Sequence, residues 1–223
     1  MSEDDPRSPL ELLGALAVEE ADAGEFTHLE IYTLKGLLTL LWHGPREARD
    51  VVLTCGGGMG SLLGPARALY ARLGADLAAE GIGVVRVGYR TPNDLGRCLH
   101  DVVAAGDLAG RNGARRFVVI GHSFGGAVAV QTGAVLGEHC AGIVTLATQS
   151  AGCEQAAETG ATPLLLLHGT TDEILPPETS ETVRTLAGHG EVVLLPGTGH
   201  LLTESAEEVT GRVRSFIADC FAD

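Results

Sequence analysis

The sequence is poor in basic residues. Its 223 residues include 29 Asp and Glu against 15 Lys and Arg, which gives a formal net charge of −14, and Lys35 is the only lysine. Proteins that bind nucleic acid carry a basic surface, and anionic membranes attract basic segments. The charge balance therefore argues against a nucleic acid or an anionic membrane surface as the partner.

Three further features are missing from the sequence, and each absence excludes a class of protein. No apolar run approaches the roughly 20 residues needed to span a bilayer, so we expect no membrane insertion. The first nine residues, MSEDDPRSP, lack the basic start and apolar core of a secretory signal. The cysteines are odd in number and form no CxxC pair, which fits neither a disulfide framework nor a zinc site. We therefore expect a cytoplasmic protein with reduced thiols at Cys55, Cys98, Cys140, Cys153 and Cys220.

The remaining composition is that of a folded protein. Hydrophobic residues make up 45% of the chain and charged residues 20%, which is typical of a compact soluble protein. A chain of this length is most simply one large domain. We expect an acidic N-terminal segment over residues 1–24, mobile over at least its first nine residues, and a single domain over residues 25–223.

Short apolar runs alternate with helical stretches along most of the chain. Residues 25–33 alternate in hydrophobicity and residues 36–43 are apolar, with Lys35-Gly36 between them as a hairpin turn. Six later runs are continuously apolar, as in strands buried on both faces. They cover residues 51–54, 84–87, 117–120, 142–146, 163–167 and 192–195. Helical spacing occurs over residues 61–80, 94–110, 124–137, 178–188 and 203–219.

Strands that alternate with helices indicate right-handed crossovers and a mostly parallel sheet with helices on both faces. We therefore expect an α/β fold, a three-layer α/β/α sandwich with about seven to eight strands and an antiparallel hairpin at one edge. Only about 15 residues separate Leu146 from Pro163, which is too few for a helical cap. Ligand sites in such sheets lie beyond the carboxyl ends of the strands, so the loops that follow the apolar runs should carry the function.

The clearest motif is Gly121-His122-Ser123-Phe124-Gly125-Gly126, which follows a buried apolar run and opens a helical stretch. A G-x-S-x-G between a strand and a helix forms a sharp turn with the serine at its apex, and the glycines avoid collisions across that turn. The N-terminus of the helix adds a positive end near the serine. The motif predicts that Ser123 is a catalytic nucleophile. The alternative is a tight structural turn.

A serine nucleophile needs a base and an acid that orients the base, and in this architecture they follow in the order serine, acid, histidine. Asp172 lies a few residues past the apolar run 163–167, and His200 lies past the run 192–195. The three residue types lie in the expected order, each just after a strand. They therefore predict a triad of Ser123, His200 and Asp172.

Other carboxylates and histidines near these loops offer alternatives. Glu173 adjoins Asp172, and Glu154 lies on the preceding loop, so each is a weaker candidate for the acid. His168 lies at the end of its strand, where we expect it to form hydrogen bonds within the turn. His122 is expected to shape the nucleophile turn rather than to transfer protons.

Acyl transfer also requires an oxyanion hole, commonly two backbone N–H groups. Phe124, directly after the nucleophile, should supply one, and Gly57 or Gly58 in the run GGGMG should supply the other, unless this run is only a flexible turn. The glycines do not form a nucleotide loop, because the run lacks the Lys of a phosphate-binding loop and does not match G-x-G-x-x-G. No metal-ligand spacing is visible, so we expect neither cofactor nor metal.

With these motifs, residues 26–219 resemble the α/β-hydrolase superfamily. The resemblance rests on Gly121-His122-Ser123-Phe124-Gly125-Gly126, on the segment from His168 to Pro176, and on Gly199-His200. It implies the α/β-hydrolase fold without a cap domain, esterase-type chemistry and a triad of Ser123, His200 and Asp172. The small size resembles the dienelactone hydrolase and carboxylesterase-like branch. Many members have His-Gly where this chain has Cys55-Gly56, and the cysteine nucleophile of some branch members is absent.

These features predict a serine hydrolase that cleaves carboxylic esters or thioesters of small or exposed acyl substrates through an acyl-enzyme on Ser123. An acyltransferase or perhydrolase using the same triad, and a non-catalytic binding protein of this fold, remain alternatives. The sequence does not indicate the oligomeric state. Arg90 is expected either to bind a substrate carboxylate or to bond loop carbonyls. The other candidate substrate contacts are Met59, Leu62, Gln149, Leu175 and Leu201.

Overall fold

The computed structural model describes residues 8–222, which form nine strands and six α-helices. The strands are β1 (Ala15–Asp22), β2 (Thr27–Thr33), β3 (Gly36–His43), β4 (Asp50–Cys55), β5 (Gly83–Gly88), β6 (Arg116–His122), β7 (Cys140–Leu146), β8 (Leu164–Gly169) and β9 (Glu191–Leu195). The helices are α1 (Pro9–Leu12), α2 (Pro65–Ala79), α3 (Leu95–Asn112), α4 (Phe124–Leu136), α5 (Glu178–Ala187) and α6 (Ala206–Phe221). The short 3₁₀ helices are η1 (Gly137–His139) and η2 (Ala156–Thr159).

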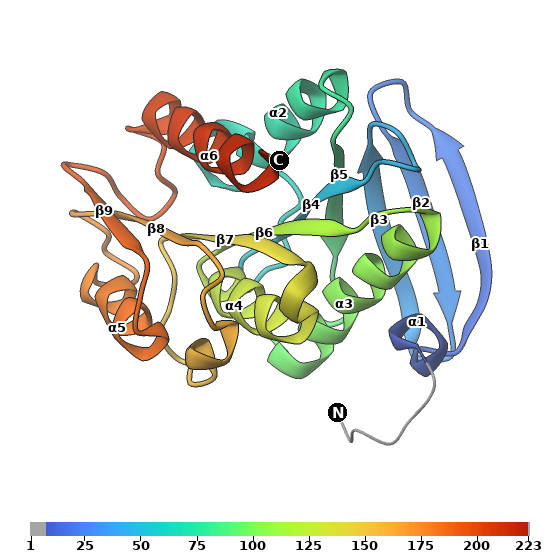
Figure 1. The fold of residues 1–223 in the computed structure, drawn as a ribbon, viewed down its shortest axis with the longest axis horizontal. Helices are drawn as coiled ribbons and strands as arrows, with labels where there is room; N and C mark the ends of the chain where they lie inside the picture. The colour runs from blue at the N-terminus through green and yellow to red at the C-terminus, as the bar shows by residue number, and fades with distance from the viewer. Residues whose placement is uncertain (1–7, 223) are drawn as a thin grey trace.

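All nine strands belong to one sheet, in the order β1-β2-β3-β5-β4-β6-β7-β8-β9 (Figure 1). The six strands from β4 to β9 run parallel, and β1, β2 and β3 add antiparallel pairs at one edge. The predicted α/β fold is therefore confirmed. The sheet has slightly more strands than the seven to eight expected.

The additional strand is β1, which lies within the segment expected to precede the domain. Residues 15–22 pair with β2 along its whole length, and all eight of them are exposed. An edge strand that buries nothing needs no apolar pattern, and its acidic residues discourage pairing with another chain. The residues expected to be mobile, 1–9, lie mostly outside the described part, and Ser8 and Pro9 cap and begin α1.

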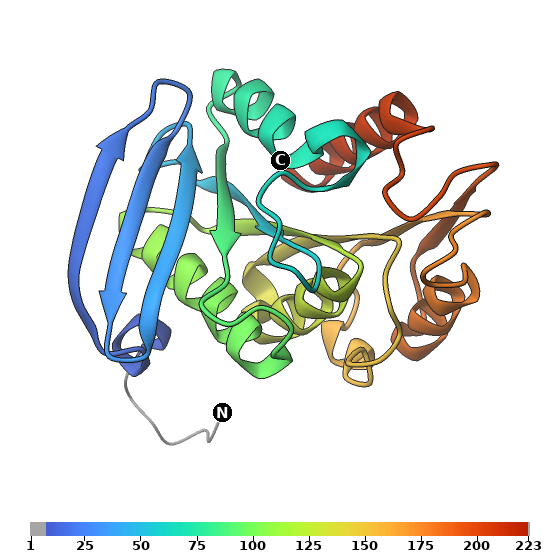
Figure 2. The same ribbon diagram turned by 180° about the vertical axis from the view of Figure 1, so that it is seen from behind.

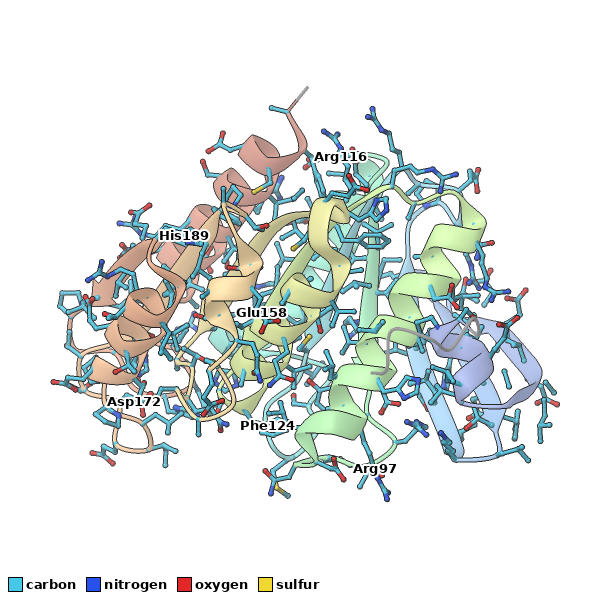
Figure 3. All side chains as sticks on the ribbon, turned by 60° about the horizontal axis from the view of Figure 1, so that its bottom comes forward. Arg97, Arg116, Phe124, Glu158, Asp172 and His189 are labelled. Atoms are coloured by element: carbon cyan, nitrogen blue, oxygen red, sulfur yellow. The ribbon has the colours of Figure 1, made fainter. Side chains whose placement is uncertain are left out.

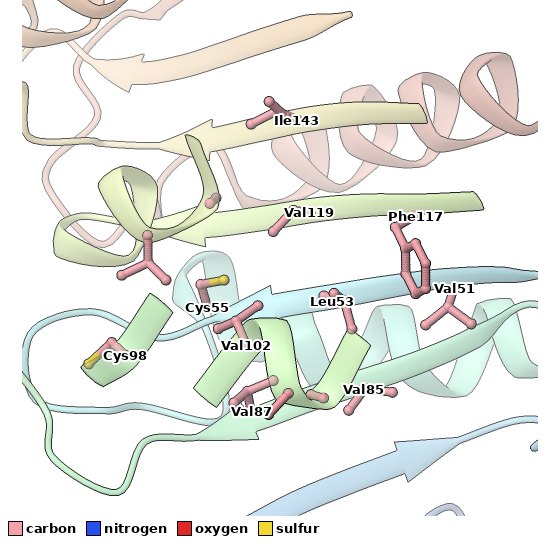
Figure 4. Close-up of a cluster of buried hydrophobic side chains, with 14 of the residues drawn as sticks. Val51, Leu53, Cys55, Val85, Val87, Cys98, Val102, Phe117, Val119 and Ile143 are labelled. Carbon is pink, nitrogen blue, oxygen red and sulfur yellow. The ribbon is translucent and has the colours of Figure 1, made fainter. Parts of the chain in front are cut away.

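The core lies in two layers, one on each face of the sheet. Successive side chains of a strand point to opposite faces. Val51, Leu53 and Cys55 of β4 therefore pack in the layer beneath α3 and α4, whereas Val52 packs in the layer beneath α2 and α6. Figure 4 shows part of the first layer, where valines of neighbouring strands meet the side of α3. Burial on both faces explains why these strands read as continuous apolar runs.

The helices divide between the two faces as the crossover rule requires. Helices α2 and α6 cover one face, and α3, α4 and α5 cover the other, as the two opposite views show (Figures 1 and 2). Between β7 and β8 there is only a loop with η2, so no cap domain covers the sheet within residues 8–222. No helix in this part of the chain is long and apolar enough to cross a membrane.

Candidate active site

Ser123 lies at a strained turn between β6 and α4. Its φ of 57° and ψ of −121° are rare for a residue with a side chain. Backbone bonds hold the turn, because the Ser123 N–H donates to the Leu146 carbonyl at 2.9 Å and the Ser123 carbonyl accepts from Gly126. A side chain at Gly121 would collide with the Gly125 carbonyl. The motif therefore needs glycine for close backbone approach.

Asp172 follows β8 and orients His200. One carboxylate oxygen, Oδ2, accepts from His200 Nδ1 at 2.7 Å, and the other accepts from the N–H groups of Ile174 (2.8 Å) and Leu175 (2.9 Å). Burial acts to raise the pKa of Asp172, but the bonds from Leu175, His200 and Ile174 outweigh it and hold the pKa below its ordinary value. An ionised Asp172 only accepts, so His200 carries its proton on Nδ1 and leaves Nε2 free to act as a base.

His168 is fully buried and contacts the carboxylate of Asp172. Its Nε2 lies 3.2 Å from Asp172 Oδ2 and 3.1 Å from the Leu175 carbonyl, so this nitrogen donates. Its Nδ1 then accepts from the Ser180 hydroxyl at 2.7 Å. Burial lowers the pKa of His168, which keeps the ring neutral. The prediction that His168 forms hydrogen bonds within the turn is therefore met, and one of these contacts reaches the acid directly.

Ser123 and His200 line one cavity of about 420 Å³ at the carboxyl ends of the parallel strands. Figure 3 shows Phe124 and Asp172 toward this end of the sheet, and Arg116, at the start of β6, toward the other. Ser123 and His200 are not hydrogen-bonded to each other in this structure, and such bonds often tighten only when substrate binds. A larger groove of about 720 Å³ lies between α3, α4 and η2, and its lining includes no serine or cysteine.

The residues predicted to donate to an oxyanion lie beside Ser123. A Cβ added at Gly57 would lie 3.8 Å from the Ser123 Cβ, and one added at Gly58 would lie 3.8 Å from the Phe124 Cβ. The Phe124 N–H is the first of α4 and has no partner within the helix. No backbone bond within residues 8–222 uses the N–H of Gly57 or Gly58. None of these three N–H groups is therefore used by a backbone hydrogen bond in the described part of the chain.

Two buried tyrosines hold the glycine loop from beneath. The Tyr70 hydroxyl donates to the Cys55 carbonyl at 2.9 Å, and the Tyr89 hydroxyl donates to the Gly56 carbonyl at 3.1 Å. Burial raises the pKa of both hydroxyls, so they remain donors. These two hydrogen bonds fix the carbonyls of the loop from the core side. The opposite side of the loop lines the cavity, so its position there is fixed as well. Neither tyrosine was predicted from the sequence.

A left-handed turn supports the loop of His200. Ala66, Arg67 and Ala68 lie within the bounds of α2 but have φ values of 49°, 58° and 62°. The Ala66 N–H donates to the Leu201 carbonyl at 2.7 Å, directly after the base. Arg72 holds the turn in place through the Ala66 carbonyl at 2.9 Å and the Thr210 hydroxyl of α6 at 2.6 Å. In Figure 2 this first part of α2 lies beside α6.

Two of the six predicted substrate contacts line the cavity. Met59 is 94% exposed and Leu201 is 61% exposed, so both form its rim. Gln149 does not line the cavity, and its N–H donates to the Ser123 carbonyl at 3.4 Å. Leu62 packs toward Gly88 of β5. The fifth, Leu175, contributes its backbone to Asp172 and His168.

Arg90, the sixth predicted contact, is placed away from the cavity. Its side chain is 4% exposed and pairs with the fully buried Asp101 of α3, and its guanidinium also donates to the Lys35 carbonyl at 3.1 Å. The Arg90 N–H donates to the same carboxylate at 2.8 Å. These contacts correct the expectation that Arg90 binds a substrate carboxylate and match the structural alternative. The carboxylate that binds Arg90 is that of Asp101 in the same chain, not that of a substrate.

Three polar residues of the cavity wall were not predicted to contact substrate. Asn93, Ser61 and His122 all line the cavity. Asn93 has a φ of 65°, in the left-handed region that asparagine tolerates, and its Oδ1 lies 3.4 Å from where a Gly58 Cβ would be. The dipeptide Pro92-Asn93 in the loop after β5 is a turn signal, but nothing in it indicates a position in the site.

The sheet topology, with two helices on one face, three on the other and the loops that carry Ser123, Asp172 and His200 at the carboxyl ends of the strands, defines an α/β hydrolase-type fold. The family model described as the alpha/beta hydrolase family matches residues 64–206, more than half of the chain. The chain therefore belongs to this family. No curated protein matches it by sequence.

Solved structures of similar fold include hydrolases of the expected branch. Est1E from Butyrivibrio proteoclasticus is 17% identical, with a TM-score of 0.72 over 93% of this chain and 100% of that chain. A dienelactone hydrolase from Anabaena variabilis is 17% identical, with a TM-score of 0.73 over 91% of this chain and 98% of that chain. At this level of identity the similarity establishes the fold.

Proposed function

We propose that this protein is a serine hydrolase that cleaves carboxylic esters or thioesters of small acyl substrates. One observation carries the proposal: the Asp172–His200 bond of 2.7 Å fixes the imidazole tautomer that leaves Nε2 basic, in a ring that shares a cavity with Ser123. A binding protein has no need of a serine in a strained turn together with an oriented base. We therefore assign Ser123, His200 and Asp172 a catalytic role in this proposal rather than a role in binding alone.

In the first half of the reaction, His200 Nε2 takes the proton of the Ser123 hydroxyl as Oγ attacks the acyl carbon. Asp172 stabilises the imidazolium that forms. The negative charge on the carbonyl oxygen is bound by the N–H of Phe124 and by that of Gly57 or Gly58, and each such donor contributes roughly 3 kcal/mol to the transition state. The tetrahedral intermediate collapses, and the alcohol or thiol leaves with the proton from His200.

In the second half, water attacks the acyl-enzyme. His200 accepts a proton from the water, the same N–H groups bind the oxyanion, and the Oγ–acyl bond breaks as Ser123 regains its proton. The products are a carboxylic acid and free enzyme. This sequence needs no group beyond the side chains and backbone already described.

The size and chemistry of the cavity support a small, uncharged acyl group. Its volume of about 420 Å³ is at the lower end of ligand sites, and no cap covers it in the described part of the chain. Its lining includes no lysine or arginine, and the net charge of −14 disfavours anions at long range. Est1E, a protein of the same fold, has been solved with the small molecule ferulic acid bound.

A panel of esters and matching thioesters with increasing acyl length tests the proposal. We expect turnover to be highest for short acyl chains and to fall by at least about 10³-fold in Ser123→Ala. Undiminished turnover in Ser123→Ala would show that another group does the chemistry. Hydrolysis that improves steadily with long acyl chains would contradict the assignment of a small substrate.

A further inference from the structure

His122 is a buried histidine that the proposed mechanism does not use. The residue is 7% exposed, lines the cavity and lies between the turn of Ser123 and the loop of His200. Its Nε2 lies 3.0 Å from the His200 carbonyl oxygen. A carbonyl oxygen only accepts, so Nε2 must carry the proton of this ring. In a neutral ring the other nitrogen, Nδ1, then presents a lone pair.

Two features of its surroundings keep His122 neutral. Burial lowers the pKa of His122 to about 4 and outweighs the hydrogen bond to the His200 carbonyl, which acts in the opposite direction. The nearby His200 ring lowers the pKa further by a smaller amount. The two imidazole rings lie 4.9 Å apart between centroids. When His200 takes the serine proton, a second positive charge at this distance is further disfavoured. His122 Nδ1 therefore remains an acceptor throughout the reaction.

The Nδ1 atom has no hydrogen-bond donor among residues 8–222 and faces the glycine loop. A Cβ placed on Gly57 would lie 3.5 Å from Nδ1 and 3.8 Å from the Ser123 Cβ. The absence of a side chain at Gly57 thus leaves room beside both the nucleophile and this lone pair. A ligand that covers the acceptor without pairing with it leaves it unsatisfied, which is costly, whereas a ligand with a donor avoids that cost.

We propose that His122 Nδ1 is an acceptor subsite for a hydroxyl group on the acyl chain, one or two bonds from the scissile carbonyl. The enzyme then prefers short hydroxyacyl esters to their deoxy counterparts. Asn93 and Ser61 add further polar groups to the same wall, and no cationic side chain is present there for an acidic group. This inference rests on the proposed function and names the class of its substrate.

Matched pairs of substrates test the inference. Ethyl lactate is compared with ethyl propionate, and ethyl 3-hydroxybutyrate with ethyl butyrate, as kcat/KM ratios. We expect a ratio of at least about tenfold in the wild type for one of the pairs, because a substrate that lacks the hydroxyl leaves the buried acceptor unpaired. In His122→Phe, which keeps a flat ring but has no acceptor, the ratio falls to near one.

The matched control is His139→Phe, which removes an exposed histidine at the opposite end of the strands and should keep the wild-type ratio. A wild-type ratio near one for both pairs, or an unchanged ratio in His122→Phe, overturns the inference. Absence of Ser123-dependent turnover of every ester instead overturns the proposed function.

A second measurement does not depend on a variant that folds or on turnover. Nitrogen NMR of the histidine rings in the wild type should show His122 Nδ1 unprotonated at neutral pH, and its signal should shift when lactate amide is added but not when propionamide is added. A protonated Nδ1, or equal shifts with the two amides, overturns the acceptor subsite.

Discussion

Asp172 makes more side-chain hydrogen bonds than Ser123 or His200. Both carboxylate oxygens are engaged, by two backbone N–H groups on one side and by His200 and His168 on the other. The carboxylate is fully buried, although the loop that carries it is at the surface. The orientation of the base is thus set by a group whose own position is fixed by its backbone.

This arrangement predicts the effect of Asp172→Asn. The amide oxygen can keep the backbone bonds, but the side chain no longer requires a proton on His200 Nδ1, so the tautomer needed for catalysis is lost. We expect kcat for a short ester to fall by about 10³–10⁴-fold with unchanged circular dichroism. Glu173→Gln, at the exposed neighbouring residue, should stay within about twofold of wild type. Equal losses in the two variants would contradict the assignment of the acid.

The position of each candidate residue just after a strand could be predicted from the sequence, whereas the direction of its side chain could not. Ser123, Asp172 and His200 each follow a strand, and the strand ends bring such positions to one edge of the sheet. Arg90 also follows a strand, but its direction is decided by Asp101, eleven positions later on a helix. No local pattern in the sequence reveals such a partner.

The first turn of α2 is strained and supports the loop that carries His200. Three consecutive left-handed residues cost about 1–2 kcal/mol each, so the turn must be stabilised by its surroundings. Arg72 links the turn to α6, and the Ala66 N–H donates to the carbonyl of Leu201, the residue after His200. Arg72 is therefore a positioning residue that acts on His200 through the backbone.

We expect Arg72→Gln to lower kcat by about 10–100-fold with a smaller change in KM, because slight misplacement of a catalytic group costs up to that much. Arg214→Gln is the matched control, since Arg214 also joins α2 and α6, through Asp76 and Glu80, but does not touch the turn. Steady-state kinetics of both variants measures the loss of kcat, and urea unfolding measures the loss of stability. If Arg214→Gln lowers kcat as much as Arg72→Gln does, the contact between α2 and α6 acts on stability and Arg72 does not position His200.

The elements themselves were largely predictable. Each of the six apolar runs overlaps a strand, and each of the five helical stretches overlaps a helix. Strands buried on both faces and helices buried on one face have different hydrophobic periods, so the sequence distinguishes them. The edge strand β1 was missed because it buries nothing. The left-handed turn was missed because Ala66 and Ala68 carry no signal for it. Its geometry comes from tertiary bonds.

Across the whole molecule, stability should depend on a histidine remote from the candidate site. His43 of β3 is 1% exposed, packs against Gly74 of α2, and has the Glu25 backbone as a polar neighbour that only partly offsets its burial. Burial, together with the nearby Arg86, lowers its pKa to about 4 from an ordinary 6.5. Between these values the unfolded chain binds a proton that the folded chain does not. Stability therefore falls as the pH drops from 6.5 toward 4.

His43→Leu should weaken this dependence. Urea unfolding at about pH 7.5 and about pH 5 should give a difference in the free energy of unfolding that is smaller in the variant by up to about 2 kcal/mol. The comparison between two pH values removes any change in packing common to both. The same difference in variant and wild type would mean that His43 is not the source.

The proposed function requires that Ser123 be a nucleophile activated by His200 and Asp172. Reaction with a fluorophosphonate, followed by mass spectrometry of the modified peptide, tests it most directly, because the reagent needs an activated serine but no knowledge of the natural substrate. We predict one adduct, on Ser123, that is absent in Ser123→Ala and forms far more slowly in Asp172→Asn. An unmodified wild-type protein, or an adduct on another serine, would contradict it.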